Sequence, residues 1–365
     1  MEQRTTIGID LAKEVFAICV LSPGGAVVES RTMRRAAFER WLVGLQGELV
    51  VAMEACSSAH HWGRQLAAAG HMVRLMAPAF VVPFRKSGKN DANDAEAIAI
   101  AAKQPTMRFV AVKTVEQQSI LSWHRAREGW IAERTALINR LRGLLTEFGF
   151  SIAQSAFRLR KALPALSTEA AVPAPIRALL LEAGEQLRCL DARVARCDEQ
   201  IAAHGRDNDT ARRLREMLGI GPLTSSALVA TVPDAAALRN SRQFGAWIGL
   251  VPRQHSPGGK PHLGELTRRG DKYLRSLLVQ GARSALQVAL RVAPDKATRL
   301  QRWILALYCR KGYHRTLVAV ANKHARIIWA LMARGEHFDN NAWQRHPLQR
   351  AATQGLDKSI QISVS

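Results

Sequence analysis

The first third of the chain contains stretches of strand length that either alternate apolar and polar residues or run continuously apolar. A two-residue period places one side chain in a core and the next outside it, and a short apolar run is typical of a buried strand. These patterns predict five strands, over residues 5–10, 15–21, 26–29, 49–54 and 72–76.

Helices are predicted in the same region by apolar residues that recur every three or four positions. They cover residues 36–45, 62–69 and the alanine-rich stretch 89–102. The order strand, strand, strand, helix, strand, helix, strand, helix is that of the ribonuclease H-like fold. In that topology the first and fourth strands lie side by side at the centre of the sheet, and helix 89–102 closes over their ends.

Four carboxylates are placed close together by this arrangement. Asp10 and Glu54 each end a strand, and Asp91 and Asp94 share one face of the first turn of a helix. The simplest alternative is that the helix acids only favour the helix N-terminus, with Asn90 as its cap. Four acids at one point instead favour bound Mg²⁺, which prefers oxygen ligands. Two such ions about 4 Å apart stabilise the attacking and leaving oxygens at a phosphodiester.

The middle of the chain predicts two long helices. Thr114 and Gln117 have capping-box spacing and begin a helix that runs to Phe148, and a second helix begins near Pro175. An antiparallel coiled coil is the simplest arrangement, a plain helical hairpin the alternative, and residues 151–175, with three prolines, the connection between them. The second helix has a heptad series of seven apolar residues: Leu180, Ala183, Leu187, Leu190, Val194, Cys197 and Ile201.

Residues 214–228 have the pattern of a helix-hairpin-helix, an apolar helix followed by Gly-x-Gly and a helix rich in hydroxyl residues. Gly219 and Gly221 would let the backbone approach a phosphate, which the N–H groups around Thr224 would then receive. A simple glycine-containing turn between two helices is the alternative. Further along, residues 273–290 are predicted to form a helix.

Composition changes the picture mainly through charge. The 365 residues include 52 Lys and Arg against 30 Asp and Glu, a net charge of +22, which indicates nucleic acid or an anionic membrane as partner. No apolar run approaches the roughly 18 residues of a membrane span, which favours nucleic acid over a membrane. Residues 251–350 hold 19 basic and 5 acidic residues, so their binding to phosphates should depend steeply on salt. The candidate contacts there are Arg253, Lys260, Arg268, Arg269, Lys272 and Arg275.

Cysteine and histidine add little chemistry. The five cysteines are scattered, without a CxxC motif, as expected for a reducing cytoplasm. His60 and His61 are adjacent, which makes a poor metal pair because neighbouring side chains point apart. Ser256, in the basic loop beside His255, is either an ordinary loop serine or a nucleophile that needs a base or a metal.

The motifs Gly8-Ile9-Asp10, Met53-Glu54-Ala55, Lys89-Asn90-Asp91-Ala92-Asn93-Asp94-Ala95 and the segment 249–275 occur in one order along the chain. With them the sequence resembles the DEDD transposases of bacterial insertion sequences. It is most similar to the bridge-RNA-guided serine recombinases, which have a RuvC-like N-terminal domain and a C-terminal transposase domain. The resemblance covers residues 5–335.

The resemblance implies that Asp10, Glu54, Asp91 and Asp94 bind Mg²⁺ and that Ser256 is the nucleophile, which holds a DNA end as phosphoserine. It also implies a homodimer or tetramer, target and donor DNA as substrates, a structured non-coding guide RNA, and a location at the nucleoid in the bacterial cytoplasm. Relatives often have Ala-Thr-Gly after the glutamate, where this chain has Ala55-Cys56-Ser57. The loop Ser256-Pro257-Gly258 also departs from the common Ser-Gly or double serine.

The expected organisation is a RuvC-like catalytic domain at 1–112, a coiled-coil arm at 113–205, a C-terminal transposase domain at 206–340 and a flexible tail at 341–365. The expected function is that of a Mg²⁺-dependent DNA transposase or recombinase. One alternative is an endonuclease of the Holliday-junction type, in which Ser256 is incidental. The other is an RNA- or DNA-binding protein without catalytic activity.

Overall fold

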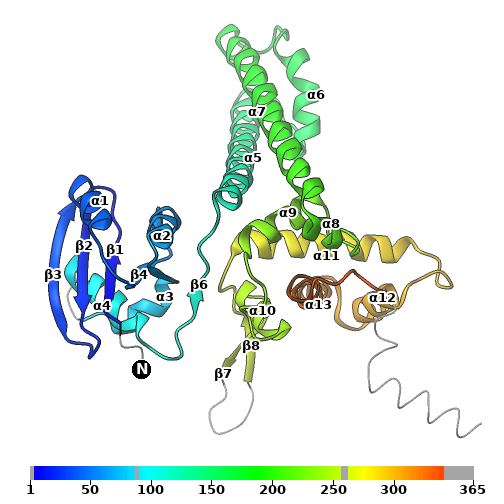
Figure 1. The fold of residues 1–365 in the computed structure, drawn as a ribbon. Coiled ribbons are helices and arrows are strands. Elements are labelled where there is room, and N and C mark those ends of the chain that lie inside the picture. Colours follow the sequence, from blue (N-terminus) through cyan, green and yellow to red (C-terminus); the bar gives the residue numbers. More distant parts are fainter. Residues whose placement is uncertain (1–3, 87–89, 256–261, 341–365) are drawn as a thin grey trace, which may run out of the picture. The chain divides into compact units, whose positions relative to one another are not determined.

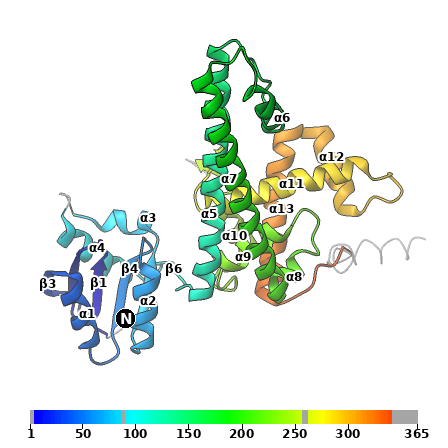
Figure 2. The same ribbon diagram turned by 90° about the horizontal axis from the view of Figure 1, so that it is seen from above.

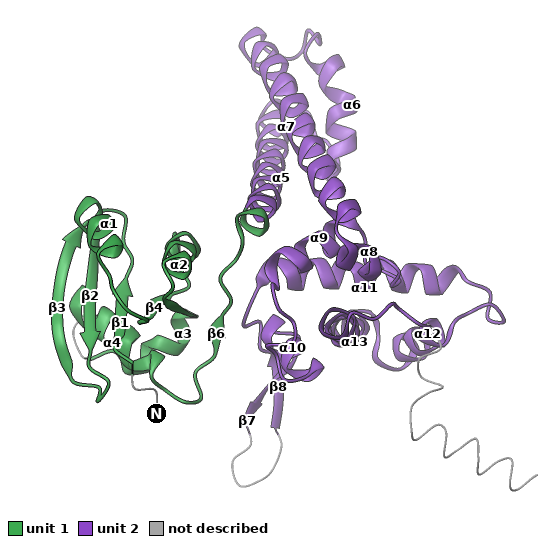
Figure 3. Ribbon diagram, viewed as in Figure 1, with its two compact units in different colours: residues 1–118 green, residues 119–365 purple. Residues whose placement is uncertain are grey.

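The computed structural model describes residues 4–86, 90–255 and 262–340 of the chain (Figure 1). Its residues divide into two units, Met1–Gln118 and Ser119–Ser365 (Figure 3). The part of the chain expected to form a tail, 341–365, lies outside the described residues. The fold is mixed α/β with a central mixed sheet, and most of the remaining structure is helical.

The first unit is built on a six-stranded sheet with the order β3-β2-β1-β4-β5-β6. β1 pairs antiparallel with β2 and parallel with β4, so the predicted adjacency of the first and fourth strands is confirmed. β3 is longer than predicted because it is an exposed edge strand that lacks a regular apolar alternation, and β6 is too short to have a period. The strands are β1 Thr6–Asp10, β2 Val15–Leu21, β3 Val27–Arg34, β4 Val50–Glu54, β5 Met72–Met76 and β6 Phe109–Val110.

Helices cover both faces of this sheet (Figures 1 and 2). On one face α1 (Arg35–Val43) and α2 (Ala59–Ala68) pack on β2, where the rings of Phe16 and Phe38 stack at 4.4 Å. On the other face lies α4 (Asp91–Ala102), preceded by the short α3 (Pro78–Val81) and η1 (Val82–Phe84). Residues of β2 alternate between the two cores, which explains why this strand is apolar throughout.

Close approach of α4 to the sheet requires small residues. A Cβ on Gly8 would lie 2.2 Å from the backbone oxygen of Ala95 and 2.6 Å from the backbone nitrogen of Ala99. Ala95 and Ala99 are fully buried against β2. The alanine-rich composition of this helix therefore sets its distance from β1, and with it the height of its first turn above the strand ends.

Two long helices, α5 (Val115–Glu147) and α7 (Ala174–Asp207), lie side by side and run antiparallel (Figures 1 and 2). Ion pairs join Arg127 to Asp198 and Arg134 to Asp191, and the partner's number falls as the first number rises. All seven heptad positions predicted for the second helix are buried. The first helix was predicted to run to Phe148, whereas α5 ends at Glu147 and Phe148 is 40% exposed.

A helix that the sequence did not predict, α6 (Ala156–Leu166), lies within the expected connection. Leu159 and Leu163 pack it into the core that α5 and α7 share. It was missed because the prolines of this stretch indicate a loop, whereas Pro164 is tolerated near the end of a short helix that tertiary packing stabilises.

The rest of the second unit is a helical core with one hairpin. α11 and α13 cross at its centre, with α9, α10 and α12 packed around them. α11 agrees with the helix predicted over 273–290. In the described part of the chain, none of the helices has the length and apolar composition to span a membrane. The elements are α8 Asp209–Leu214, α9 Pro222–Thr231, α10 Ser241–Ile248, β7 Pro252–His255, β8 His262–Leu266, α11 Lys272–Arg291, α12 Arg299–Lys311 and α13 Tyr313–Arg334.

Candidate active site

The four predicted acids come from three elements of the first unit that meet at one end of the sheet. Asp10 is the last residue of β1 and Glu54 the last of β4, and these strands run parallel in register, with Ile9 opposite Met53. Asp91 and Asp94 lie in the first turn of α4, whose start is set by Asn90. The Asn90 side-chain oxygen accepts a hydrogen bond of 2.9 Å from the backbone N–H of Ala92.

Electrostatics shows that these carboxylates act on one another. Burial, which is the largest cause, and the charges of Asp94, Glu54 and Asp91 together raise the pKa of Asp10 to about 6, while Arg85 acts in the opposite direction. Like charges disfavour one another's ionised forms only at short range. The strand ends and the helix turn therefore form one acidic cluster, which a cation would stabilise.

Among the described residues, Arg85 is a cation that contacts this cluster. It follows η1, and its Nη2 lies 2.9 Å from Oε1 of Glu54 while its Nε lies 3.0 Å from Oδ1 of Asp94. Sequence reasoning missed Arg85, because one arginine in a basic chain stands out in no pattern. Among the described residues, no three acids, histidines or cysteines are arranged as a ready metal site. The all-carboxylate donor set nevertheless fits a hard divalent cation such as Mg²⁺ in its chemistry.

The neighbouring cysteine and histidine do not extend the cluster. Burial raises the pKa of the Cys56 thiol, as do the charges of Glu54 and Asp10, so the thiol stays protonated near neutral pH. His60 accepts a hydrogen bond of 3.2 Å from the backbone N–H of Lys113 at Nδ1, and so holds the segment that leads into α5. The candidate metal ligands are therefore the carboxylate oxygens of the four acids.

The predicted phosphate contacts of the second unit differ in how far they are exposed. Arg253 on β7, Arg268, Arg269 and Lys272 are exposed, whereas Ser256 and Lys260 lie outside the described residues. Arg275 is half-buried, and its Nη1 donates to the backbone oxygens of Ile248 (2.9 Å) and Arg269 (3.3 Å). Arg275 therefore joins the end of α10 to the turn before α11.

The glycine-rich turn between α8 and α9 is more enclosed than its sequence suggested. Gly219 has φ +88°, and a Cβ there would lie 2.4 Å from the backbone oxygen of Gly281 on α11. Thr224 is only 6% exposed, so its side chain faces the core and is not presented to an external phosphate. Gly221, the exposed N-cap of α9, is the residue of this set that keeps access to solvent.

A buried polar network near the start of α5 was also absent from the predictions. His124 is hydrogen-bonded to Tyr273 (2.9 Å) and to Ser226 (3.1 Å), and Ser226 to His204 (2.9 Å). Burial, with the nearby His204, lowers the pKa of His124 to about 4, so its ring is neutral. The network joins α5, α7, α9 and α11 across 150 positions of sequence, and no local signal could have revealed it.

Comparison with known families adds an independent finding. Residues 211–297 match the family model described as the transposase IS116/IS110/IS902 family, and residues 7–150 match a transposase model of the DEDD, IS110 type. Three relatives are similar over almost the whole chain. A probable family 20 transposase of Pseudomonas aeruginosa is 46% identical, with 90% of this chain and 96% of that protein covered. The transposase for insertion sequence element IS1111A of Coxiella burnetii is 40% identical (93% and 92%), and that for IS1328 of Yersinia enterocolitica is 36% identical (93% and 99%).

Proposed function

The chain belongs to the IS116/IS110/IS902 family of transposases, and from this premise we propose that it cuts and rejoins DNA strands by a Mg²⁺-dependent reaction with a serine nucleophile. We assign the first unit to the ribonuclease H-like, RuvC-like fold. The pairing of β1 with β4 and the position of α4 across the strand ends support this assignment. The proposed domains remain 1–112 for catalysis, 113–205 for a coiled-coil arm and 206–340 for the transposase domain.

One observation carries the proposal: the ends of β1 and β4 and the first turn of α4 bring four carboxylates together at one end of the sheet. Burial and the charges of the other three acids raise the pKa of Asp10, and such perturbed carboxyl groups are typical of functional sites. We propose Asp10, Glu54, Asp91 and Asp94 as the ligands. A bound Mg²⁺ would supply positive charge to the phosphodiester oxygens. In this scheme Arg85 is the counter-charge of Glu54 and Asp94 until the cation binds, and it is then available to a phosphate nearby.

Ser256, between β7 and β8, is the proposed nucleophile, on the strength of the family resemblance. Its Oγ would form a bond to phosphorus while the bond from phosphorus to the leaving sugar oxygen breaks. The hydroxyl proton goes to a base, and the leaving oxygen takes up a proton. Resealing reverses this step with a sugar hydroxyl of the new partner strand, which frees the serine.

Guidance by a structured non-coding RNA and assembly into dimers or tetramers are part of the same proposal. The charge of 19 basic against 5 acidic residues over 251–350 supports contact with more than one nucleic-acid strand. The paired helices α5 and α7, with their buried heptad positions, support a coiled-coil arm that could join subunits. The turn around Gly221 supports a helix-hairpin-helix phosphate contact.

The test is strand exchange by purified protein with element DNA, target DNA, the transcript of the flanking non-coding DNA, and Mg²⁺. Wild-type protein should form a covalent protein–DNA adduct, and Ser256→Ala should lose both adduct and exchange. Asp94→Asn should lose both as well, while Glu96→Gln, on the same helix but paired with Lys86, should retain them. Full exchange by Ser256→Ala would refute the serine nucleophile, and cleavage without any adduct would indicate attack by water.

A further inference from the structure

A cavity of about 460 Å³ lies in the first unit, between the short helices α3 and η1 and the turn that follows α4. Its size is within the range of pockets that hold small organic ligands. The acidic cluster is at the first turn of α4, whereas this cavity is lined by residues that follow the last turn of the same helix. None of the four acids lines it, so the cavity is separate from the proposed metal site.

The apolar side of the cavity contains an aromatic ring that is open to solvent. Phe80 on α3 is 44% exposed, and Pro83 and Phe84 of η1 line the cavity beside it. Met107, after α4, lines it as well. An exposed ring at the wall of a recess is a surface on which a nucleobase can stack, whatever its sequence.

The polar side is formed by Gln104 and Arg108. Arg108 is exposed, and it has no hydrogen bond or ion pair with any described residue. The amide Nε2 of Gln104 donates to the backbone oxygen of Ile100 at 3.2 Å, while its Oε1 accepts no hydrogen bond from the described residues. Among the described residues that line the cavity, none is an aspartate or a glutamate. An anion at Arg108 therefore meets no negative charge from the cavity wall.

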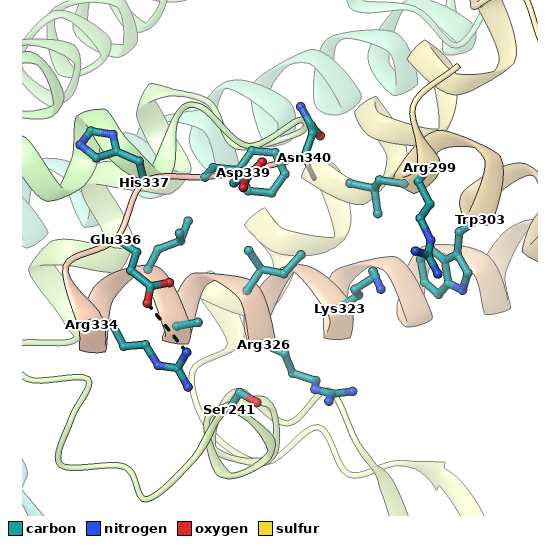
Figure 4. A pocket seen from close by; sticks show the side chains of 15 residues that line it. Ser241, Arg299, Trp303, Lys323, Arg326, Arg334, Glu336, His337, Asp339 and Asn340 are labelled. Atoms are coloured by element: carbon teal, nitrogen blue, oxygen red, sulfur yellow. Dashed lines mark ion pairs between the residues drawn. The ribbon is translucent and has the colours of Figure 1, made fainter. Parts of the chain in front are cut away.

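A larger cavity in the second unit lacks this property. It has a volume of about 610 Å³ and lies between α12, α13 and the segment that follows α13 (Figure 4). Its cationic side chains share the wall with Glu336 and Asp339, and Arg334 is paired with Glu336 at 3.9 Å. The smaller cavity, which has a cation and no acid in its described wall, is therefore the better site for an anionic ligand.

The backbone around the smaller cavity is restrained before any ligand enters. Pro78 and Pro83 each fix a backbone angle at the start of α3 and within η1. Val81 between them is fully buried in the core that contains the alanines of α4. On the other side, the backbone N–H of Met107 donates to the oxygen of Gln104 at 3.1 Å and closes the turn. A recess that is already formed reduces the entropy cost of binding.

We propose that this cavity binds one unpaired nucleotide of a nucleic-acid strand, with the base against Phe80, its polar edge at Gln104 and its phosphate at Arg108. An apolar protein segment in the same place would bury the guanidinium of Arg108 and the amide oxygen of Gln104 without partners, which costs free energy. A base within a duplex is stacked and paired and cannot enter a recess, whereas an unpaired or extruded one can. The inference rests on the proposed function only in taking nucleic acid as the ligand.

The test is photocrosslinking of the full chain, without Mg²⁺, to strands of eight nucleotides that contain 5-iodouracil, one of DNA and one of RNA. Mass spectrometry identifies and quantifies the crosslinked peptides. In the wild-type protein we expect a crosslink within residues 79–108, in addition to those expected within the basic segment 251–350. The strand with the larger yield within 79–108, DNA or RNA, identifies the source of the nucleotide.

Two variants and two matched controls examine the site. Phe80→Ala should lower the yield within 79–108 at least five-fold, because stacking of one base on an aromatic ring contributes about that factor or more to binding. Arg108→Gln leaves the ring in place and should lower the yield at least three-fold, with a weaker dependence on salt. As controls, Phe157→Ala removes an exposed ring from α6, and Arg40→Gln removes an exposed cation from α1, on the opposite face of the sheet from α4. Each control should change the yield less than two-fold.

The proposal is overturned if the wild-type protein gives no crosslink within 79–108, or if Arg108→Gln and Arg40→Gln lose the same yield. A duplex of the same sequence that crosslinks there as strongly as the single strand would overturn it too. If Phe80→Ala keeps the crosslinks and changes the mass of the particle in solution, the cavity is a protein interface and the nucleotide site is wrong. Asp94→Asn should keep the crosslinks, so a failed nucleotide site and a failed strand-exchange function are distinguished.

Discussion

The sheet of the first unit and the helical core of the second both bury polar side chains, but charge is handled differently in the two. At the sheet end, four carboxylates remain close together and repel one another, with Arg85 as counter-charge. In the helical core, His124 and His324 have pKa values lowered to about 4 and are neutral. A neutral buried group can serve structure alone. A cluster that keeps like charges together is stabilised by a bound cation.

The largest effect is expected from the acidic cluster. Asp94→Asn keeps the size of the side chain but replaces a charged carboxylate by a neutral amide. Strand exchange should therefore fall by about 100-fold or more. Mg²⁺ should raise the Tm of the wild-type protein, because it binds the folded state, and it should not raise the Tm of Asp94→Asn. Glu96→Gln serves as the control on the same helix. An unchanged Mg²⁺ response in Asp94→Asn would mean that the cluster is not a metal site.

Because His324 is buried, we expect the stability of the second unit to depend on pH. Burial, together with the charge of Lys323, lowers the pKa of His324 to about 4, against about 6.5 in an unfolded chain. Between these values the unfolded chain binds a proton that the folded chain does not, so stability falls as pH decreases from 6.5 to 4. The loss is about 3 kcal/mol for the whole interval.

Urea unfolding at pH 7 and pH 4, followed by fluorescence, measures this loss. Among the described residues neither ring nitrogen of His324 has a hydrogen-bond partner, so His324→Leu should fold and should show a smaller loss. An equal loss in wild type and His324→Leu would place the acid sensitivity elsewhere. His124, which is hydrogen-bonded, accounts for part of what remains.

Close packing predicts an effect of intermediate size in the first unit. Gly8→Ala introduces a Cβ 2.2 Å from the backbone oxygen of Ala95, so α4 must move away from β1. Overpacking of this kind costs about 1–3 kcal/mol. Because α4 carries Asp91 and Asp94, Mg²⁺ binding measured by calorimetry should weaken together with Tm. Gly44→Ala is the control, since its Cβ would make only ordinary contacts of 3.5 Å or more.

The smallest effect is expected at Arg85. Its direction distinguishes a residue that competes with the cation from one that positions the carboxylates. An exposed ion pair contributes about 1 kcal/mol or less, so removing Arg85 as a competitor should tighten Mg²⁺ binding by no more than about five-fold. Calorimetry on Arg85→Gln and on Lys86→Gln, which is paired with Glu96 instead, gives the matched comparison. Weaker Mg²⁺ binding in Arg85→Gln would show that Arg85 positions Glu54 and Asp94 rather than competing with the cation.

Prediction from sequence worked for elements whose buried face follows from the spacing of their own apolar residues. The strands β1, β2, β4 and β5 follow from short apolar runs, and the seven heptad residues of α7 follow from a 3.5-residue period. Prediction was weaker at α6, where the prolines indicated a loop although two buried leucines pack a helix into the core. It was also weaker at Phe148, which was predicted to end the first helix but is 40% exposed.

By itself, the sequence determined the order of the main elements of the first unit, the face that the heptad residues of α7 bury, and the four acids at element ends, because these depend on residues near one another in the chain. Only the tertiary structure decided which side chains meet. Arg85 lies between Glu54 and Asp94, Glu216 anchors His337, and His124 contacts Ser226 and Tyr273. Charge and hydrogen-bond energies depend on distance in space, and local periodicity contains no information about contacts between residues far apart in the chain.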